Sequence, residues 1–147
     1  MSSAIRPGVL VFKDVGPDPV KSAHCGEVMA TLATRLGMTG LITDGGVRDI
    51  LEVEALGFRY FAAGLVPAHG TTRFVRVNVP VTICGITVNP GDLIHGDANG
   101  VTTIPWEIAP AVAEAALKIR KKEADLIGFI KGEDFEVDGV LRRLFTH

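Results

Sequence analysis

Apolar and polar positions along the first third of the chain follow the two periods that distinguish strands from helices. Short apolar runs at residues 9–12 and 40–43 predict buried strands. Between them, residues 26–36 carry an apolar stripe at helical spacing, which predicts a helix that ends at Gly37. Residues 47–56 predict a second helix. This succession of strand, helix, strand and helix is typical of an α/β fold.

Strand patterns dominate the chain after the second predicted helix. Residues 74–79 alternate apolar and polar side chains, as a half-exposed strand does. Gly85 separates two apolar runs and predicts a bend or bulge, and residues 89–92 predict a turn. The expected strands are residues 58–62, 74–79, 81–84, 86–88, 93–94 and 101–104. Early βα units followed by many strands favour a mixed α/β sandwich over a doubly wound nucleotide fold.

The C-terminal part of the sequence predicts helix. Pro105 suits the first turn of a helix that runs to about residue 125. Residues 131–147 are charged with scattered apolar positions, and we interpret them as a short helix docked on a partner subunit or as a partly loose tail. Because the chain has no internal repeat, low-complexity tract or linker, we expect one domain over residues 1–147.

Composition narrows the function classes. The chain has 147 residues, enough to bury a core, and a formal net charge of −2. Its most basic stretch, residues 118–122, fits the solvated face of a helix, so we do not expect nucleic acid as a partner. No apolar run is long enough to span a bilayer, and residues 1–6 lack the apolar core of a signal peptide. Two cysteines suggest no disulfide framework, so we expect a soluble cytoplasmic protein.

The strongest candidate chemistry follows the strand at residues 40–43. A glycine turn at residues 44–46 is followed at once by Arg48 and Asp49. These two side chains would lie at the carboxyl end of a strand, where α/β folds gather ligand-binding groups. A guanidinium binds a carboxylate in a bidentate way, and a carboxylate can hold a hard cation. The pair therefore suits a small anionic substrate bound to a metal, although it could equally be a surface pair at a helix start.

Other polar residues have structural interpretations of their own. Glu27 could be a first-turn acid of its helix, and Glu52 an exposed helix residue. His69 lies in a loop without a recognisable ligand partner, so a structural or incidental role is favoured over a metal or substrate role. Turn formation is favoured over chemistry at Asp44, Asp92 and Asp97, and simple packing at Cys25.

Several motifs between residues 25 and 105 fall in a characteristic order and spacing. They are residues 26–31, 40–49, 57–58, 79–81, 85–88, 90–92 and 96–101. Together they resemble the RraA-like family, which includes 4-hydroxy-4-methyl-2-oxoglutarate aldolases, oxaloacetate decarboxylases and the regulator of ribonuclease E activity. The resemblance implies a swivelling β/β/α sandwich similar to phosphohistidine domains. It also implies homotrimers with active sites between subunits, and Mg²⁺ or Mn²⁺ in the aldolases.

The sequence departs from that family at its start. Family members usually carry a further N-terminal segment before the strand that matches residues 9–12, and it contributes part of the substrate pocket. This sequence begins almost at that strand, so we expect it to lack the segment. Residues 106–147, the C-terminal helical tail, are not diagnostic of the family.

The resemblance assigns roles to individual residues. Asp49 would ligate the cation, with Glu27 and Glu52 as weaker candidates, and Arg48 would bind a carboxylate or keto oxygen of the substrate. The backbone N–H groups at Glu27, Val28 and Met29 would open a helix and form an anion site. These roles imply a metal-dependent carbon–carbon lyase, a class II pyruvate aldolase or oxaloacetate decarboxylase. Its small keto-acid substrates would be cleaved to pyruvate.

Four other functions compete with the lyase, and one of them is a degenerate family member with only a structural role. Another is a non-catalytic regulator that binds a ribonuclease. The regulator that gave the family its name lacks the aspartate of the Arg-Asp pair, which is present in this chain as Asp49. A phosphohistidine carrier would need its histidine where Met29 stands. Many family members formerly carried the name methyltransferase. This sequence has no glycine-rich loop that would bind a nucleotide-like cofactor, which argues against that function.

Overall fold

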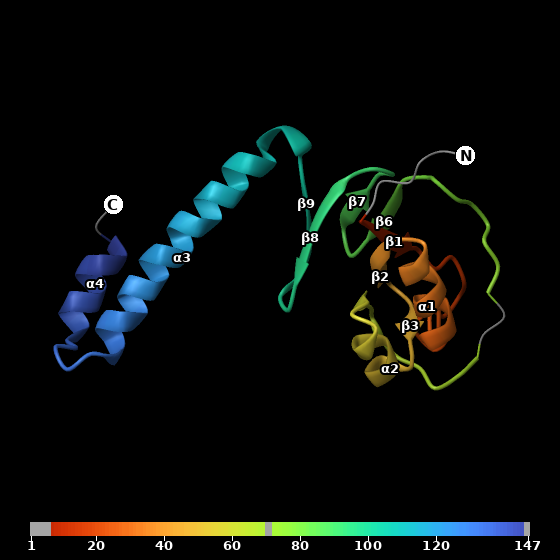
Figure 1. Cartoon of the computed structure of the whole chain (residues 1–147), viewed down its shortest axis with the longest axis horizontal. Helices are drawn as coiled ribbons and strands as arrows, with labels where there is room; N and C mark the ends of the chain where they lie inside the picture. Colours follow the sequence, from red (N-terminus) through yellow and green to blue (C-terminus); the bar gives the residue numbers. More distant parts are fainter. Residues whose placement is uncertain (1–6, 70–71, 146–147) are drawn as a thin grey trace. The chain divides into compact units, whose positions relative to one another are not determined.

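A three-stranded parallel sheet lies at the centre of the first part of the chain (Figure 1). The computed structural model describes residues 7–69 and 72–145. Strand β2 (Met38–Thr43) is the middle strand, between β1 (Gly8–Phe12) and β4 (Arg59–Phe61). All three strands run parallel, so their carboxyl ends meet at one edge of the sheet.

Two helices contribute to the principal core. Helix α1 (Glu27–Arg35) connects β1 to β2, and α2 (Ile50–Ala55) lies between β2 and β4. The core is buried because the apolar faces of the helices meet alternate residues of the sheet. Its buried members are Cys25, Ala30, Ala33, Leu41, Val47, Val53 and Phe58.

Two antiparallel hairpins follow the parallel sheet in the chain. Strands β6 (Val81–Ile83) and β7 (Ile86–Val88) form one, and β8 (Leu93–Asp97) and β9 (Gly100–Ile104) form the other. The predicted bend or bulge at Gly85 is a two-residue hairpin turn, because both Cys84 (φ 49°) and Gly85 (φ 82°) have the positive φ of a type I′ turn.

The predicted turns at the hairpin ends are confirmed. The Asp92 carboxylate accepts a hydrogen bond from the Asn89 N–H at 2.8 Å, and Asp97 accepts one from the Asn99 N–H at 2.8 Å. Both carboxylates therefore stabilise local turns, as the sequence indicates.

The predicted helix over residues 47–56 is partly wrong. Residues Gly46–Val47 form a short strand, β3, which pairs with β5 (Gly64–Leu65), and the helix begins only at Ile50. Val47 is buried in the core, and its C=O accepts a hydrogen bond from the Val66 N–H. The backbone groups of residues 46 and 47 are thus hydrogen-bonded in the β3–β5 pair, so the helix starts after them.

The predicted strand over residues 74–79 is wrong. None of these residues is in a strand, and the side chains of Phe74 and Val77 are 70% and 71% exposed. The Phe74 ring packs edge-on against Phe12 of β1, 5.6 Å between centroids. Alternation alone does not make a strand, because a strand needs a neighbour to satisfy its backbone groups.

Helices make up the second unit, which comprises Pro105–His147. A 3₁₀ turn (Trp106–Ile108) leads into α3 (Ala109–Lys131), which extends past the predicted end near residue 125. Helix α4 (Val137–Phe145) then packs on α3: Gly139 lies against the Phe129 ring, and the Arg143 guanidinium lies 3.8 Å from the centre of that ring. The predicted tail helix therefore docks on its own chain.

Some sequence predictions are not tested by this structure. Residues 1–6 and 146–147 lie outside the described residues. The chain divides into two compact units, Met1–Ile104 and Pro105–His147, and the single domain stays a prediction. Within the described ranges, none of the helices combines the length and the apolar character that crossing a bilayer requires.

Candidate functional site

The candidate site is built on a short backbone ribbon beyond the carboxyl end of β2. The Gly46 C=O accepts a hydrogen bond from the His24 N–H at 2.8 Å, and the Cys25 C=O accepts one from the Arg48 N–H at 3.0 Å. These bonds hold the start of α1 beside Arg48 and Asp49, although the start of α1 and this pair are more than twenty residues apart in sequence.

Asp49 links the two helices. Its backbone adopts the left-handed conformation (φ 57°, ψ 47°) immediately before α2, which aspartate tolerates better than most residues. Its Oδ2 accepts a hydrogen bond at 2.9 Å from the Glu27 N–H, the first of α1. Gly26 makes this approach possible, since a Cβ there would lie 2.4 Å from Asp49 Oδ2.

Arg48 lies between Asp49 and a loop histidine. One terminal guanidinium nitrogen, Nη2, is 2.8 Å from His69 Nε2, and Arg48 Nε is 3.8 Å from Asp49 Oδ2. The Arg48 and Asp49 side chains are 29% and 34% exposed, so both are accessible to a small molecule. A cavity of about 90 Å³ lies beside Arg48 and is lined by Ala23, His24, Cys25, Gly26, Met29, Arg48, His69 and Thr72.

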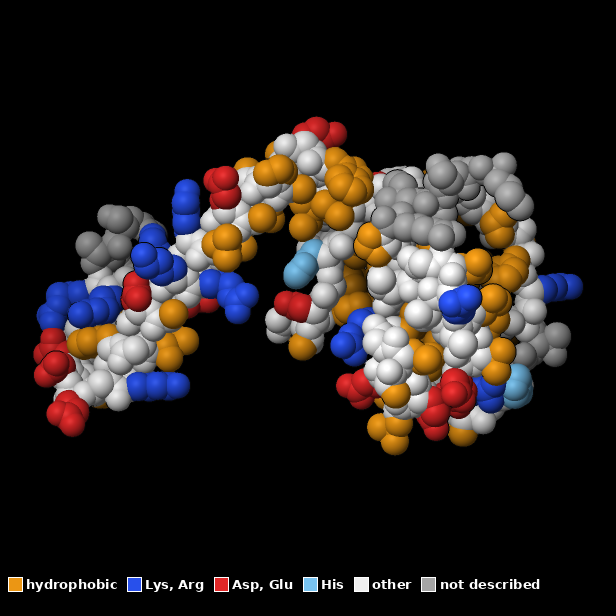
Figure 2. Space-filling view, viewed as in Figure 1, with side chains coloured by type: hydrophobic (Ala, Val, Ile, Leu, Met, Phe, Trp, Pro, Cys, Tyr) orange, Lys and Arg blue, Asp and Glu red, His pale blue; other side chains and the backbone are white. Residues whose placement is uncertain are grey.

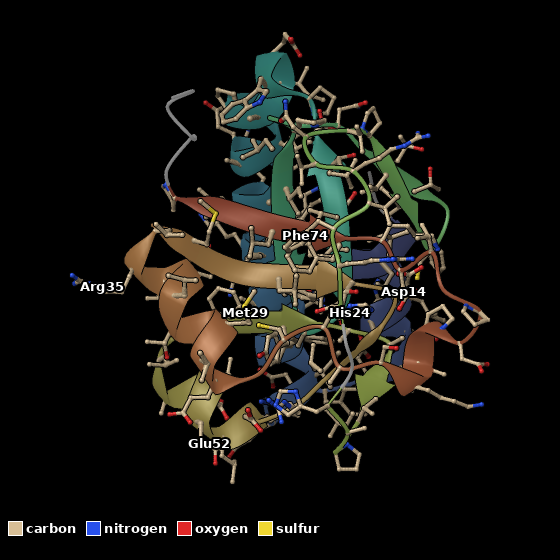
Figure 3. All side chains as sticks on the ribbon, turned by 90° about the vertical axis from the view of Figure 1, so that its right-hand side faces the viewer. Asp14, His24, Met29, Arg35, Glu52 and Phe74 are labelled. Atoms are coloured by element: carbon tan, nitrogen blue, oxygen red, sulfur yellow. The ribbon has the colours of Figure 1, made fainter. Side chains whose placement is uncertain are left out.

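The structure brings only some of the predicted site residues together. The N–H of Glu27 binds Asp49, while its side chain is exposed at the start of α1. Val28 and Met29 follow in the same first turn, where N–H groups have no partner within the helix. Glu52 is exposed on the outer side of α2 (Figure 3). Among the described residues, no three His, Cys, Asp or Glu side chains form a group that could hold a metal ion.

A second polar cluster was missed by the sequence analysis. Asp14 follows β1 and Asp44 follows β2, so the parallel register places them together at the sheet edge. His24 and Asp14 are labelled in Figure 3, and His24 Nε2 is 2.8 Å from Asp14 Oδ2. The Asp14 N–H donates to Asp44 Oδ1 at 2.9 Å. Lys13 forms an ion pair with Asp44. The signal available in the sequence was the position of two aspartates after two adjacent parallel strands.

The charges in this cluster shift two pKa values. Burial disfavours the charged form of Asp44, but the Lys13 ammonium and the Asp14 N–H outweigh it, so the pKa of Asp44 is lowered. The hydrogen bond to Asp44 raises the pKa of Lys13. Asp44 therefore has a structural role, because it binds Lys13 and the Asp14 N–H at the end of β1. This agrees with the sequence analysis, which favoured turn formation over chemistry at Asp44.

Cys25 and Tyr60 lie behind the site in a dry environment. Burial raises the pKa of the Cys25 thiol, and the neighbouring Tyr60 hydroxyl lowers it in part. Burial also raises the pKa of the Tyr60 hydroxyl, and the neighbouring Cys25 and Asp49 add to that effect. A thiol that stays protonated is a poor nucleophile, so Cys25 is a packed core residue, as the sequence indicates.

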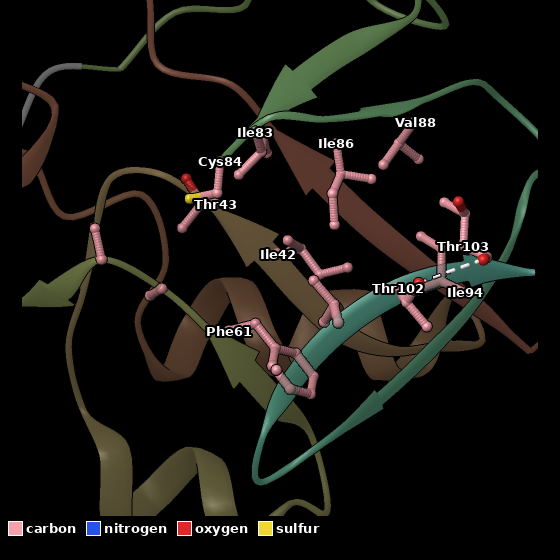
Figure 4. Close-up of a pocket in the computed structure, with 14 residues that line it drawn as sticks. Ile42, Thr43, Phe61, Ile83, Cys84, Ile86, Val88, Ile94, Thr102 and Thr103 are labelled. Carbon is pink, nitrogen blue, oxygen red and sulfur yellow. Dashed lines mark hydrogen bonds between the residues drawn. The ribbon is translucent and has the colours of Figure 1, made fainter.

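A larger cavity of about 350 Å³ lies between the parallel sheet and the two hairpins (Figure 4). Its walls are mostly aliphatic, with Phe61 at one side and Thr102 and Thr103 at another. Cys84 is its only titratable lining residue among those described. The polar groups that acid–base or anion chemistry needs lie instead around Arg48.

Comparisons with known proteins agree with this architecture. The model of the RraA-like family (Aldolase/RraA) matches residues 1–103. The chain belongs to the RraA-like family. The mixed α/β fold implied by the sequence motifs is thereby confirmed.

Individual relatives carry different names. A protein of Halalkalibacterium halodurans, named as a candidate 4-hydroxy-4-methyl-2-oxoglutarate aldolase, is 38% identical over 120 residues, which cover 81% of this chain and 55% of that protein. The crystal structure of a protein from Pseudomonas syringae pv. tomato is 27% identical with a TM-score of 0.74, and the match covers 92% of this chain and 68% of that one. RraAS2 of Streptomyces coelicolor, from the family of RNase ES inhibitors, is 28% identical with a TM-score of 0.64, covering 81% and 61%. This chain thus spans little more than half of the curated aldolase relative.

Proposed function

We propose that the chain is part of a divalent-metal-dependent lyase that forms pyruvate from 4-hydroxy-2-oxo acids, from oxaloacetate, or from both. The observation that supports it is the junction of Arg48, Asp49 and the first turn of α1 beside a small polar cavity. A family whose relatives are named as candidate aldolases supports the same reaction class.

Asp49 is the residue we propose to hold the cation. Its Oδ2 is fixed by the Glu27 N–H, and no hydrogen bond to its Oδ1 is found among the described residues. One anchored carboxylate with a free oxygen suits Mg²⁺ or Mn²⁺, which keep several water ligands, better than it suits a closed protein cage. Glu27 and Glu52 remain weaker candidates. A bound divalent cation would supply positive charge to a keto oxygen and its neighbouring carboxylate.

Arg48 is the residue we propose to bind the substrate. Its guanidinium is already oriented by His69 and Asp49, so little conformational entropy is lost when an anion arrives. Fixed positive charge at this place favours the negative charge that develops when the C3–C4 bond breaks and the enolate of pyruvate forms. The Val28 and Met29 N–H groups would add two donors for a carboxylate.

The first experiment measures pyruvate release from oxaloacetate with Mg²⁺ and then with EDTA. Free metal decarboxylates oxaloacetate unaided, so Asp49→Ala protein must be measured alongside the wild type. We expect turnover that requires both the metal and Asp49. Equal rates for the two proteins on oxaloacetate and on 4-hydroxy-4-methyl-2-oxoglutarate would exclude the lyase.

A second candidate function is a non-catalytic regulator that binds a ribonuclease. It is favoured by the likeness to RraAS2 and to a Thermus thermophilus RraA described as an RNA-processing inhibitor, 26% identical with a TM-score of 0.59. The retention of Asp49 favours the enzyme. If both substrates fail, co-purification with a ribonuclease becomes the next measurement. In either case we propose a cytoplasmic homotrimer.

A further inference from the structure

Two histidines border the cavity beside Arg48, and their hydrogen bonds give them opposite roles. His69 Nε2 is 2.8 Å from Arg48 Nη2. A guanidinium has only N–H donors, so the His69 nitrogen must be the acceptor. The lone pair of His69 Nε2 is therefore already used, and this histidine orients Arg48.

His24 has the reverse arrangement. Its Nε2 is 2.8 Å from Asp14 Oδ2, and an ionised carboxylate can only accept. The proton therefore lies on Nε2, which leaves the Nδ1 lone pair of the neutral ring available as a base. This is the arrangement in which a carboxylate fixes the tautomer of a catalytic histidine.

The Asp14–His24 pair is held rigidly. The two side chains are only 10% and 12% exposed. The Gly16 N–H donates to the other oxygen of Asp14, and the His24 ring lies so close to Gly45 that a Cβ there would be 2.0 Å from His24 Cδ2. The ring orientation is thus fixed from two sides, which a general base requires.

We propose that His24 is the general base of the retro-aldol reaction and that Asp14 is its positioning residue. This inference rests on the proposed lyase function, because His24 lines the same cavity as Arg48. His24 Nδ1 takes the proton of the substrate 4-hydroxyl, the C3–C4 bond breaks, and its electron pair passes into the enolate of pyruvate. A carbonyl product leaves, and the imidazolium then returns its proton to C3 of the enolate, which regenerates neutral His24.

The two proposed substrates separate this role from a structural one. Oxaloacetate has no 4-hydroxyl proton, so loss of CO₂ yields the same enolate without a base. His24→Gln should therefore lower the cleavage of 4-hydroxy-4-methyl-2-oxoglutarate about 100-fold or more. The rate of CO₂ release from oxaloacetate should stay near that of the wild type. Asp14→Asn should show the same selectivity with a smaller loss.

The chain offers a matched control in a second histidine–aspartate pair. His95 Nε2 is 3.8 Å from Asp97 Oδ2 in the β8–β9 hairpin, where both side chains are more than half exposed. His95→Gln should leave both reactions unchanged. Equal losses on the two substrates in His24→Gln, or an unchanged cleavage rate, would overturn the assignment of His24 while the lyase itself stands. A wild-type protein inactive on both substrates would instead overturn the proposed function, and this inference with it.

Discussion

Asp49 holds a left-handed backbone conformation that costs a non-glycine residue on the order of 1 kcal/mol. The hydrogen bond that its carboxylate accepts from the Glu27 N–H offsets this cost and joins Asp49 to the start of α1. The sequence motif places Arg48 next to Asp49, but it gives no sign of the left-handed backbone from which the Asp49 carboxylate reaches the first turn of α1. Strain of this kind is concentrated at functional sites, which agrees with the role proposed for Asp49.

Gly26 provides a test of this geometry. A Cβ at residue 26 would lie 2.4 Å from Asp49 Oδ2 and 2.8 Å from Arg48 Nε. We therefore expect Gly26→Ala to lower the free energy of unfolding by about 1–3 kcal/mol, as overpacking does. Thermal unfolding of the two proteins measures it. Gly64→Ala is the matched control, because nothing lies within 4 Å of a Cβ there. Equal melting temperatures for Gly26→Ala and the control would contradict the described contact.

Asp44 predicts how stability depends on pH. Its pKa is lower in the folded chain than the ordinary value of 3.8, so its stabilising effect is present above that value and is lost as pH falls through the folded pKa. Asp44→Asn should cost about 1 kcal/mol at neutral pH, the value of one typical hydrogen bond. The difference from the wild type should disappear in acid. Urea unfolding at a series of pH values from 7 into the acid range measures this difference in the free energy of unfolding, and a difference that grows in acid would refute the ion pair.

The elements themselves were predictable where one face of the segment is buried. Helix α1, strand β2 and both hairpins lie where the periodicity places them. Residues 74–79 alternate without forming a strand, because alternation does not reveal whether a neighbouring strand exists. The cluster of Asp14, His24 and Asp44 was equally hidden, since it depends on which strands are neighbours in the sheet.

The α3–α4 hairpin carries a prediction about its own packing. Phe129 is half-buried between Gly139 and the Arg143 guanidinium, whereas Leu117 on the same helix is 67% exposed. Phe129→Ala should lower the melting temperature of the helical circular dichroism signal, because it removes this contact. Leu117→Ala should leave it unchanged. If the two variants melted alike, the packing of α4 on α3 would be refuted.

At the scale of the whole molecule, much apolar surface remains uncovered within this single chain. Val28, Leu51 and Phe74 are 80%, 78% and 70% exposed, and apolar side chains are visible on the surfaces of both units (Figure 2). Exposed apolar patches mark interaction surfaces. The sequence alone predicted an oligomer only through its family resemblance, since exposure depends on the fold.

The uncovered apolar surface leads us to expect an oligomer, and the family resemblance implies that this oligomer is a homotrimer. Sedimentation equilibrium at micromolar concentration measures the mass of the particle directly. The expected mass is three times that of the 15.6 kDa chain. A monomer at every concentration would contradict the trimer and would leave the apolar surface to a different partner.

The most direct test of the central claim is pyruvate release from 4-hydroxy-4-methyl-2-oxoglutarate by the wild type, Arg48→Ala and Asp49→Asn with Mg²⁺ present. Asparagine keeps the size of Asp49 and tolerates its left-handed backbone, so that variant removes charge alone. We predict turnover in the wild type and a loss of roughly 100-fold or more in both variants, as expected when charge stabilisation is removed from a transition state. Folded variants that release pyruvate at the wild-type rate would show that Arg48 and Asp49 do not form the active site.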